Sequence, residues 1–349
     1  MKNKKIITIL LNCSLLFNST IILCRSQDDL PSSISRELDK LDKFEFESKL
    51  HDTKFLGDIP AVEELLKPKG FSEVTVKARK NICSQETLNI STFAKLNTND
   101  IKKTFLIIPG FLRGRGLDMV PRYKDEKDVN YMFVDTRGKG RSEGLPVNYN
   151  LFRAWKGIQQ FGEHEYLDVA ACVQKIVTHD KQHQIQSRIY LQTLCAGTYN
   201  SIKALKYLKD NDFESYQAVE GIVFDSGWAK ITDIAESSIQ ADSAKLCKKR
   251  NISFAHPIIC YGLKILYKRY FQPHYEKQTP ITDIIKEIDQ KVLFIHATDD
   301  QYVSFDKIEP LIENTRKKEV WKVPHAKHGF NHLIEEEEYD DKVNNFTNE

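Results

Sequence analysis

Six short apolar runs, separated by stretches with helical spacing, constrain the fold of this chain more than any other feature. Each run has the length and the β-branched and aromatic content of a buried parallel strand. Helical patterns, for example over residues 163–178 and 200–209, stand between the runs. This alternation predicts an α/β fold with a doubly wound, mostly parallel sheet. The runs are KTFLIIPG, NYMFVDTRG, SRIYLQTLCAG, AVEGIVFDSG, KVLFIHATDD and EVWKVPHAKHG.

Two earlier runs have a different pattern. FSEVTVKARK (71–80) and ETLNISTFAKL (86–96) alternate apolar and polar side chains, which predicts an antiparallel pair at the edge of the sheet. In doubly wound sheets, ligands bind beyond the carboxyl ends of the parallel strands. The chemically reactive residues of this chain follow those ends in sequence, so the functional site is expected there.

The start of the chain has the pattern of a targeting segment. Three lysines in residues 1–5 precede a largely apolar stretch, 6–24, and small residues follow it. The pattern predicts a signal peptide over residues 1–26 and a secreted or extracytoplasmic protein, with an uncleaved anchor as the alternative. No stable membrane insertion is expected after cleavage. The formal net charge of +2 gives no indication of a nucleic-acid partner, and no pattern indicates an oligomeric state.

One long insertion interrupts the strand rhythm. Its mostly helical spacing predicts a cap, and residues 256–271 within it are amphipathic. We interpret this segment as a helix packed on the main domain, with a helix on a membrane surface as the alternative. The predicted division is a signal peptide over 1–26, an N-terminal extension over 27–70, the α/β core over 71–226 and 291–349, and the helical cap over 227–290.

Five cysteines follow the predicted signal peptide. An odd number in an oxidising compartment leaves at least one thiol unpaired. Cys247 and Cys260 are close in sequence and both lie in the predicted cap, so they are the first candidates for a disulfide. Cys172 is interpreted as a core residue. Cys195 is different, because it stands where a strand-like run turns at once into a helix-like run, LQTLCAGTYNS.

Five motifs in one order give the chain its resemblance to a known family. IIPGF resembles the His-Gly loop of α/β-hydrolases, DTRGKGRS their Asp-x-Arg-Gly-x-Gly-x-Ser turn, and TLCAG their nucleophile elbow. IHATDD resembles the strand end that bears the acid, and HAKHGF the histidine loop. Cysteine stands where most members have serine, and Thr193 stands where they usually have glycine. The resemblance implies the α/β-hydrolase fold.

The resemblance also implies a triad of Cys195, Asp300 and His328 in the family's chain order. A helix N-terminus and a nearby histidine stabilise the thiolate, which is the nucleophilic form of cysteine. The alternative for Cys195 is a buried thiol that acts only as a small hydrophobe. His325 is the rival base. The rival acids are Asp299, which is interpreted as a solvated loop charge, and Asp225 at the end of the preceding strand, while His296 is interpreted as a core histidine.

The resemblance maps the oxyanion donors onto the backbone N–H groups of Phe111 and Ala196. Pro109 replaces the usual histidine of this loop, which removes a side chain that often braces it. Several cations follow the first two parallel strands, and we expect Arg113 and Arg115 to bind a carboxylate or phosphate of the substrate, against ordinary structural arginines as the alternative. The other cations are Arg122, Arg137, Lys139 and Arg141. No metal or nucleotide cofactor is expected.

These residues together predict a hydrolase that cleaves an ester or thioester of a small-molecule or acyl substrate. Its intermediate is an acyl-cysteine, which water resolves. An acyltransferase with the same triad, in which an amine or hydroxyl resolves the intermediate, is the alternative. Peptidase activity ranks below esterase or thioesterase activity. A catalytically inactive binding protein is the third alternative, since Thr193 and the cysteine both depart from the family pattern.

Overall fold

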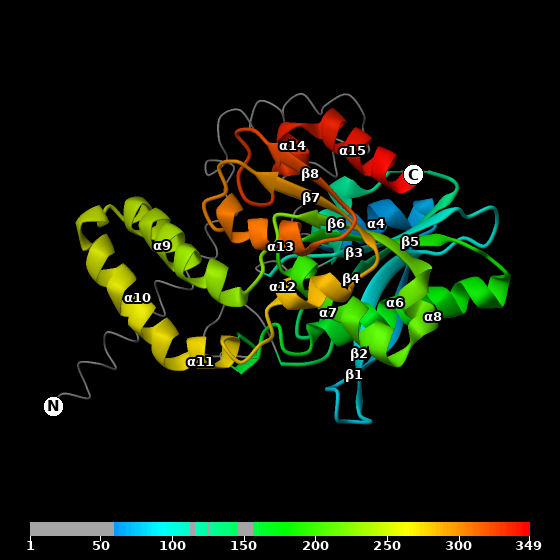
Figure 1. The fold of residues 1–349 in the computed structure, drawn as a ribbon, viewed down its shortest axis with the longest axis horizontal. Helices are drawn as coiled ribbons and strands as arrows, with labels where there is room; N and C mark the ends of the chain where they lie inside the picture. The colour runs from blue at the N-terminus through cyan, green and yellow to red at the C-terminus, as the bar shows by residue number, and fades with distance from the viewer. Residues whose placement is uncertain (1–58, 112–115, 125, 146–155, 159) are drawn as a thin grey trace.

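The computed structural model describes residues 59–111, 116–124, 126–145, 156–158 and 160–349. Within these ranges, eight strands form one sheet in the order β1-β2-β4-β3-β5-β6-β7-β8 (Figure 1). β2 is antiparallel to both β1 and β4, and all other neighbours are parallel. The predicted sheet and its antiparallel edge pair are confirmed. The strands are β1 (Ser72–Arg79), β2 (Thr87–Lys95), β3 (Lys103–Ile108), β4 (Val129–Val134), β5 (Arg188–Leu194), β6 (Val219–Asp225), β7 (Lys291–Ala297) and β8 (Lys318–Val323).

Helices follow the strands in the alternation that the sequence predicts. The α-helices are α4 (Ile59–Leu66), α6 (Glu165–His183), α7 (Ala196–Asn211), α8 (Phe213–Ala218), α9 (Ile231–Lys249), α10 (His256–Tyr270), α11 (Gln272–Tyr275), α12 (Ile281–Ile284), α13 (Glu309–Asn314), α14 (Asn331–Ile334) and α15 (Glu336–Asn348). The 3-10 helices are η3 (Lys67–Lys69), η4 (Gly116–Arg122), η5 (Ser253–Ala255), η6 (Ile285–Glu287) and η7 (Phe305–Lys307). The predicted signal peptide and most of the predicted N-terminal extension lie outside the described residues.

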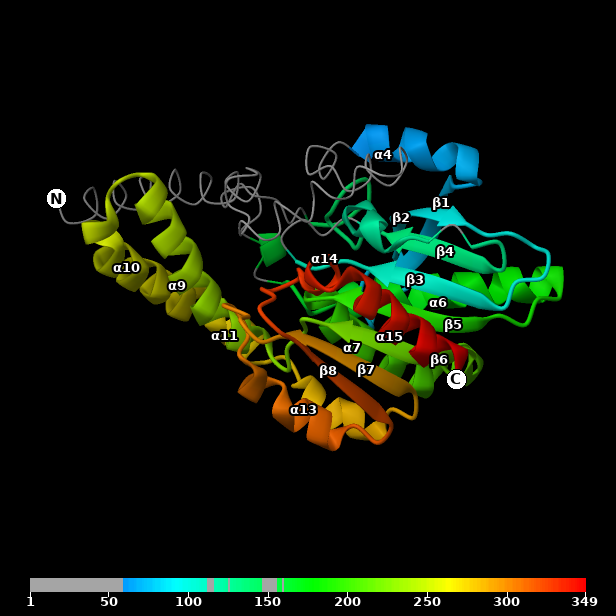
Figure 2. The same ribbon diagram turned by 90° about the horizontal axis from the view of Figure 1, so that it is seen from above.

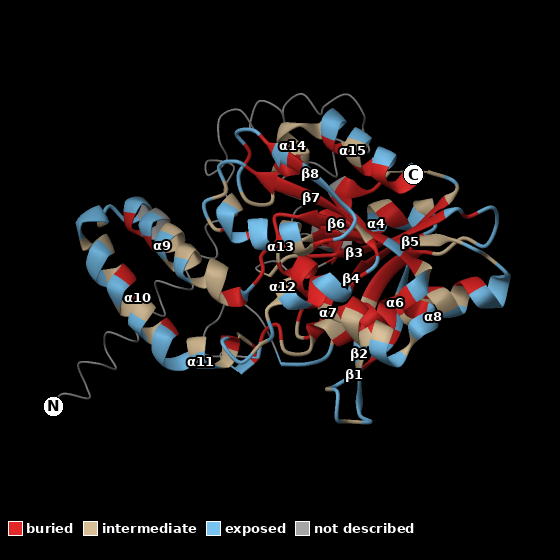
Figure 3. Cartoon of the chain, in the orientation of Figure 1, coloured by how far each residue is buried: buried red, intermediate tan, exposed pale blue. Residues whose placement is uncertain are grey.

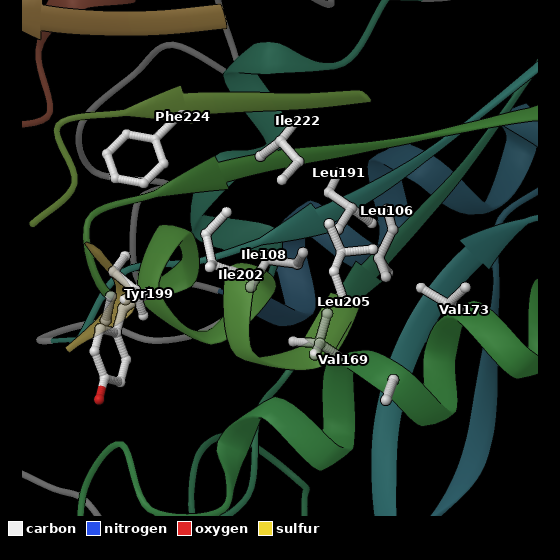
Figure 4. Close-up of a cluster of buried hydrophobic side chains, with 14 of the residues drawn as sticks. Leu106, Ile108, Val169, Val173, Leu191, Tyr199, Ile202, Leu205, Ile222 and Phe224 are labelled. Carbon is white, nitrogen blue, oxygen red and sulfur yellow. The ribbon is translucent and has the colours of Figure 1, made fainter. Parts of the chain in front are cut away.

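One face of the sheet packs against α6, α7 and α12. Side chains alternate between the two faces along each strand, so Leu106 and Ile108 of β3 lie on this side. Figure 4 shows them among Val169 of α6 and Ile202 and Leu205 of α7. Each such side chain stabilises the fold by about 1.5–3 kcal/mol when fully buried.

The other face packs against α4, η4 and α15. Phe105 and Ile107 of β3 lie on this side and share a core with Leu66, Val120 and Phe346. Both faces are therefore covered, which explains why every residue of β3 is buried (Figure 3). The polar side chains that could take part in a reaction therefore lie at the ends of the strands and not along them.

The range predicted as the cap contains a helical hairpin, α9 and α10, that projects away from the sheet (Figures 1 and 2). α10 packs on α9 through Cys260, Leu263 and Tyr267, and α11 leads the chain back toward the sheet. The disulfide expected between Cys247 and Cys260 is absent. Both residues are buried free thiols. In the described part of the chain, no helix combines the length and the apolar character needed to span a bilayer.

Candidate active site

Cys195 occupies a strained turn between β5 and α7. Its φ of 55° and ψ of −111° lie in a region that non-glycine residues rarely adopt. The Cys195 N–H donates to the carbonyl of Asp225 at 2.9 Å, which fixes the turn to the end of β6. A Cβ at Gly197 would approach the carbonyl oxygen of Ile108 to 2.4 Å, so only glycine fits there. The helix begins at Ala196, four residues earlier than the helical pattern in the sequence.

Thr193 replaces the usual glycine of the elbow without opening the sheet. Its side chain is fully buried, and its hydroxyl donates to the carbonyl of Val223 at 2.7 Å. The backbone of Thr193 stays in register between Ile108 of β3 and Phe224 of β6. The departure from the family pattern is therefore accommodated by one extra hydrogen bond to the neighbouring strand.

Asp300 and His328 form a directly bonded pair. Nδ1 of His328 lies 2.7 Å from Oδ2 of Asp300, so a proton on Nδ1 is donated to the carboxylate. The other carboxylate oxygen, Oδ1, accepts the backbone N–H groups of Tyr302 and Val303 at 2.8 and 2.9 Å. The Asp300 side chain is 1% exposed. Three hydrogen bonds therefore hold a buried carboxylate against the imidazole.

The loop that carries His328 lies over the end of β5. The Gly329 N–H donates to the Ser226 hydroxyl at 3.0 Å, and a Cβ on Gly329 would contact the side chain of Leu194 at 3.6 Å. Nε2 of His328 is buried and has no hydrogen-bond partner in the described chain. A catalytic base would use this nitrogen. The loop contacts Leu194, the residue directly before Cys195, so Nε2 lies unpaired near the Cys195 side chain.

Charge couples His328 to Cys195. Burial by itself would lower the pKa of the imidazole, but the negative charge of the Cys195 thiolate and the bond to Asp300 outweigh it and raise the pKa to about 10. Burial would likewise raise the pKa of Asp300, and the bond from His328 holds it below the ordinary range. These shifts favour a positively charged imidazolium beside the Asp300 carboxylate.

The rival acid, Asp225, is fully occupied elsewhere. Arg122 lies 2.8 Å and the Tyr339 hydroxyl 3.2 Å from its Oδ2. The Asn331 amide and the Ser226 hydroxyl donate to its Oδ1 at 2.7 and 2.9 Å. Asp225 is completely buried, so it forms a saturated ion pair with Arg122.

The other rivals also lie in different surroundings. His325 and Asp299 are exposed. His296 is buried, and its Nε2 lies 2.8 Å from the carbonyl of Val303 and 3.8 Å from Asp300. It supports the acid loop from behind, in agreement with the interpretation as a core histidine.

Both predicted oxyanion donors lie beside Cys195. A Cβ on Gly110 would stand 3.2 Å from Cβ and 3.6 Å from Sγ of Cys195, so the Gly110–Phe111 peptide borders the nucleophile. Ala196 is the first residue of α7, where N–H groups have no intrahelical partner. Neither N–H donates to another group of the described chain. A carbonyl oxygen held over Cys195 would find two free donors.

Most of the cations near this edge have structural partners. Arg122 pairs with Asp225, Arg137 with Asp168 at 2.7 Å, and Arg141 with Glu63 and Glu73. Carboxylates of the protein itself therefore pair with these three arginines, as the alternative of structural arginines expects. Arg113 and Arg115 lie outside the described residues.

Lys139 is the exception, and sequence reasoning gave it no separate role. It is 5% exposed, and no carboxylate of the described chain lies within ion-pair distance. Its ammonium lies 3.4 Å from the carbonyl of Gly110 and above the rings of Phe111 and Phe161, at 5.8 and 5.3 Å from their centroids. Burial lowers its pKa against the opposing charges of Glu165 and Cys195. In the sequence, Lys139 is marked only by its position as a charged residue between two glycines.

Comparison with known proteins identifies the fold. Neither a protein-family model nor a curated protein sequence matches the chain. Among solved structures, an esterase from Pyrococcus furiosus is similar with a TM-score of 0.55 and 17% identity, over 80% of this chain and 92% of that one. A bacterial membrane phospholipase A is similar with a TM-score of 0.50 and 13% identity, over 85% and 92%. A Pyrococcus horikoshii acylaminoacyl peptidase is similar with a TM-score of 0.50 and 13% identity, over 80% and 42%.

The sheet order, the elbow and these similarities together establish the α/β-hydrolase fold. The fold class that the sequence motifs implied is therefore confirmed.

Proposed function

We propose that this protein hydrolyses an ester or thioester through a triad of Cys195, His328 and Asp300. The observation that carries the proposal is the geometry of one sheet edge. A cysteine in an elbow, a bonded imidazole–carboxylate pair and two unpartnered backbone donors meet there. The ion pair between Asp225 and Arg122 supports the choice of Asp300, and not Asp225, as the acid.

In the first half-reaction, the Cys195 thiolate attacks the carbonyl carbon and a C–S bond forms. The electron pair of the C=O bond moves to oxygen, and the N–H groups of Phe111 and Ala196 stabilise that oxyanion. As the tetrahedral intermediate collapses, the bond to the leaving alcohol or thiol breaks. His328 gives its Nε2 proton to the leaving group, and Asp300 holds the ring through Nδ1.

In the second half-reaction, water replaces the leaving group. His328 takes a proton from water through Nε2, the hydroxide attacks the acyl-cysteine, and the C–S bond breaks to release the acid and the thiolate. An amine or alcohol in place of water would make the same site an acyltransferase. Product analysis with and without an amine acceptor separates the two reactions.

Lys139 supports the oxyanion site in this proposal. A peptide unit is planar and trans, so its C=O and N–H point in opposite directions. Because the Lys139 ammonium holds the Gly110 carbonyl, the N–H of Phe111 in the same peptide is turned to the other side. Lys139 therefore takes over the bracing of a loop in which Pro109 has replaced the usual histidine.

Two further parts of the proposal rest on the sequence alone. Residues 1–26 direct export, which N-terminal sequencing of the mature protein tests. Arg113 and Arg115, which follow the oxyanion loop, contact a carboxylate or phosphate of the substrate. If the Arg113→Ala/Arg115→Ala variant kept the same preference between neutral and anionic esters, this contact would be wrong.

The central experiment measures alkylation and acylation of one thiol. In the described part of the chain Cys83 is exposed and Cys195 is partly exposed, whereas Cys172, Cys247 and Cys260 are buried, so a Cys83→Ser background of the protein without residues 1–26 isolates Cys195. We expect fast alkylation by iodoacetamide at neutral pH, which His328→Ala slows by about 10-fold or more. A panel of p-nitrophenyl esters, acyl thioesters and aminoacyl anilides then identifies the acyl class, with an acyl adduct on Cys195 detected by intact mass spectrometry.

Cys195→Ala is the negative control and should reduce turnover by about 10³-fold or more. A thiol that reacts no faster than free cysteine, together with no turnover of any substrate in the panel, would contradict the proposal. It would favour the inactive binding protein.

A further inference from the structure

The outer face of α10, together with the 3-10 helix η5 that precedes it, carries an unusual apolar stripe. Phe254, Ile258, Tyr261 and Ile265 are 85%, 77%, 68% and 49% exposed. The spacing of three and four residues places Ile258, Tyr261 and Ile265 on one side of α10, and Phe254 lies in η5, directly before this helix. The opposite side, with Cys260, Leu263 and Tyr267, is the one that packs on α9.

This concentration is specific to the hairpin. Nine large apolar residues of the described chain are exposed, and five of them, the four of the stripe and Tyr270, fall between residues 254 and 270. Single exposed apolar residues are ordinary, but a contiguous group marks a surface that contacts something else. The stripe therefore needs an apolar partner.

The basic residues of the hairpin indicate the chemistry of the partner that the stripe contacts. Residues 231–270 contain seven Lys and Arg against three Asp and Glu, whereas the whole chain has 51 against 49. The basic residues flank the stripe in sequence, at 248–250 near the tip of the hairpin and at 268–269 near its base. Lys248, Lys268 and Arg269 are exposed. Apolar side chains bordered by cations match the interface of an anionic bilayer, where the apolar groups enter the acyl region and the cations face phosphates.

The hairpin is also connected to the candidate triad. The Tyr302 hydroxyl donates to Asp242 of α9 at 2.9 Å, and the ring of Tyr302 stands edge-on to His328 with 5.2 Å between centroids. α9 begins shortly after β6, whose last residue, Asp225, accepts the N–H of Cys195. The hairpin is therefore attached to the strand ends that hold Cys195.

We propose that the stripe of Phe254, Ile258, Tyr261 and Ile265 docks the protein on an anionic lipid surface. Docking does not require catalysis. Its further consequence, that the substrate is an acyl ester of a membrane lipid, rests on the function proposed above.

The test is sedimentation with vesicles of phosphatidylcholine, with and without phosphatidylglycerol. We expect the wild-type protein to bind the anionic vesicles, less tightly as salt is raised, and Ile258→Asp to weaken binding by about 10-fold or more. Phe213→Asp is the matched control, because Phe213 is a 55% exposed aromatic on α8, away from the hairpin. It should bind like the wild type.

Turnover is measured in a separate experiment with two substrates, the soluble ester p-nitrophenyl acetate and the phosphatidylglycerol of the vesicles. Ile258→Asp should keep turnover of the soluble ester and lose that of the vesicle lipid. Wild type that binds no vesicles, or Ile258→Asp that binds as well as wild type, overturns the docking proposal. If wild type instead forms a dimer that Ile258→Asp dissociates, the stripe is an interface between copies. Vesicle binding without hydrolysis of any ester leaves docking intact and contradicts only the proposed function.

Discussion

Asp225 is the last residue of β6 and Asp300 follows the neighbouring strand β7, yet the two carboxylates have different partners. Asp225 is bonded to Arg122, a cation that keeps its charge at any physiological pH. Asp300 is bonded to His328, a group that can release and recover a proton. Each carboxylate accepts several hydrogen bonds and both are buried, so burial alone does not separate them.

The comparison teaches that the partner decides the role. A buried carboxylate paired with arginine forms a fixed structural unit, and removing one partner leaves an uncompensated charge. A carboxylate paired with histidine orients the ring and stabilises its protonated form. The two sites should therefore respond in opposite ways when each carboxylate becomes an amide of the same shape.

The largest expected effect is on catalysis at Asp300. In Asp300→Asn, the amide oxygen can still accept the N–H groups of Tyr302 and Val303, but the amide NH₂ would face Nδ1 of His328. The imidazole must then carry its proton on Nε2, where it cannot act as a base. We expect kcat/KM for the best panel ester to fall by about 10³–10⁴-fold, with a small change in the free energy of unfolding. Equal activity of Asp300→Asn and wild type would remove Asp300 from the mechanism.

The next effect is on stability at Asp225. Asp225→Asn keeps one acceptor oxygen, but its amide NH₂ faces groups that donate to the carboxylate, and the Arg122 guanidinium is left buried without a counter-charge. We expect the free energy of unfolding, measured with urea, to fall by about 3–5 kcal/mol. The molecules that remain folded should keep most of their Cys195 reactivity toward iodoacetamide. If stability were unchanged and reactivity lost, the roles of the two carboxylates would have to be exchanged.

A third test uses pH. The pKa of His328 rises from an ordinary 6.5 to about 10 in the folded protein. A raised pKa means that the folded state binds the proton more tightly, so this stabilisation is complete below pH 6.5 and is lost as pH rises through 10.

The free energy of unfolding should therefore decline over that interval. Cys195→Ala removes the thiolate that raises the pKa, so its decline should be smaller by about 1–3 kcal/mol. Urea unfolding of both proteins across this range measures the difference. Parallel pH curves would show that Cys195 and His328 are not coupled.

The sequence predicted the sheet because strand runs buried on both faces leave an unmistakable apolar pattern. It also indicated Cys195, Asp300 and His328, since each directly follows such a run or its loop. It favoured Asp300 over Asp225 only through the family resemblance. The contact that supports this choice is with Arg122, which lies over a hundred positions before Asp225 and reaches it only in the folded chain.

The same limit explains one wrong expectation and two features that the sequence left open. The sequence could not show that Arg137 and Arg141 are paired, because their partners Asp168 and Glu63 are distant in sequence. The disulfide between Cys247 and Cys260 was inferred from proximity in sequence, which does not fix the geometry that a disulfide requires. Lys139 had no signal of its own, because a lysine beside glycines is ordinarily a solvated loop residue.

The smallest expected effect concerns Lys139, which extends the comparison to cations. Arg122 is neutralised by a carboxylate, whereas among the described residues the Lys139 ammonium is held by the Gly110 carbonyl and two aromatic faces and by no carboxylate. Lys139→Met keeps the length and apolar stem but removes the donor. Because the Phe111 N–H then loses its fixed direction, we expect kcat to fall by about 10-fold with KM within about 2-fold.

Two readouts separate this positioning role from a general disturbance of the site. A substrate-like aldehyde forms a hemithioacetal whose oxyanion needs the Phe111 and Ala196 donors, so its affinity should fall by the same factor as kcat. Alkylation by iodoacetamide needs the thiolate but no oxyanion site, so the plateau of its rate against pH should be unchanged. Lys139→Arg, which keeps a donor, should restore part of kcat. If alkylation and aldehyde binding fell together, Lys139 would act on Cys195 directly, as an unpaired buried charge next to a thiolate does.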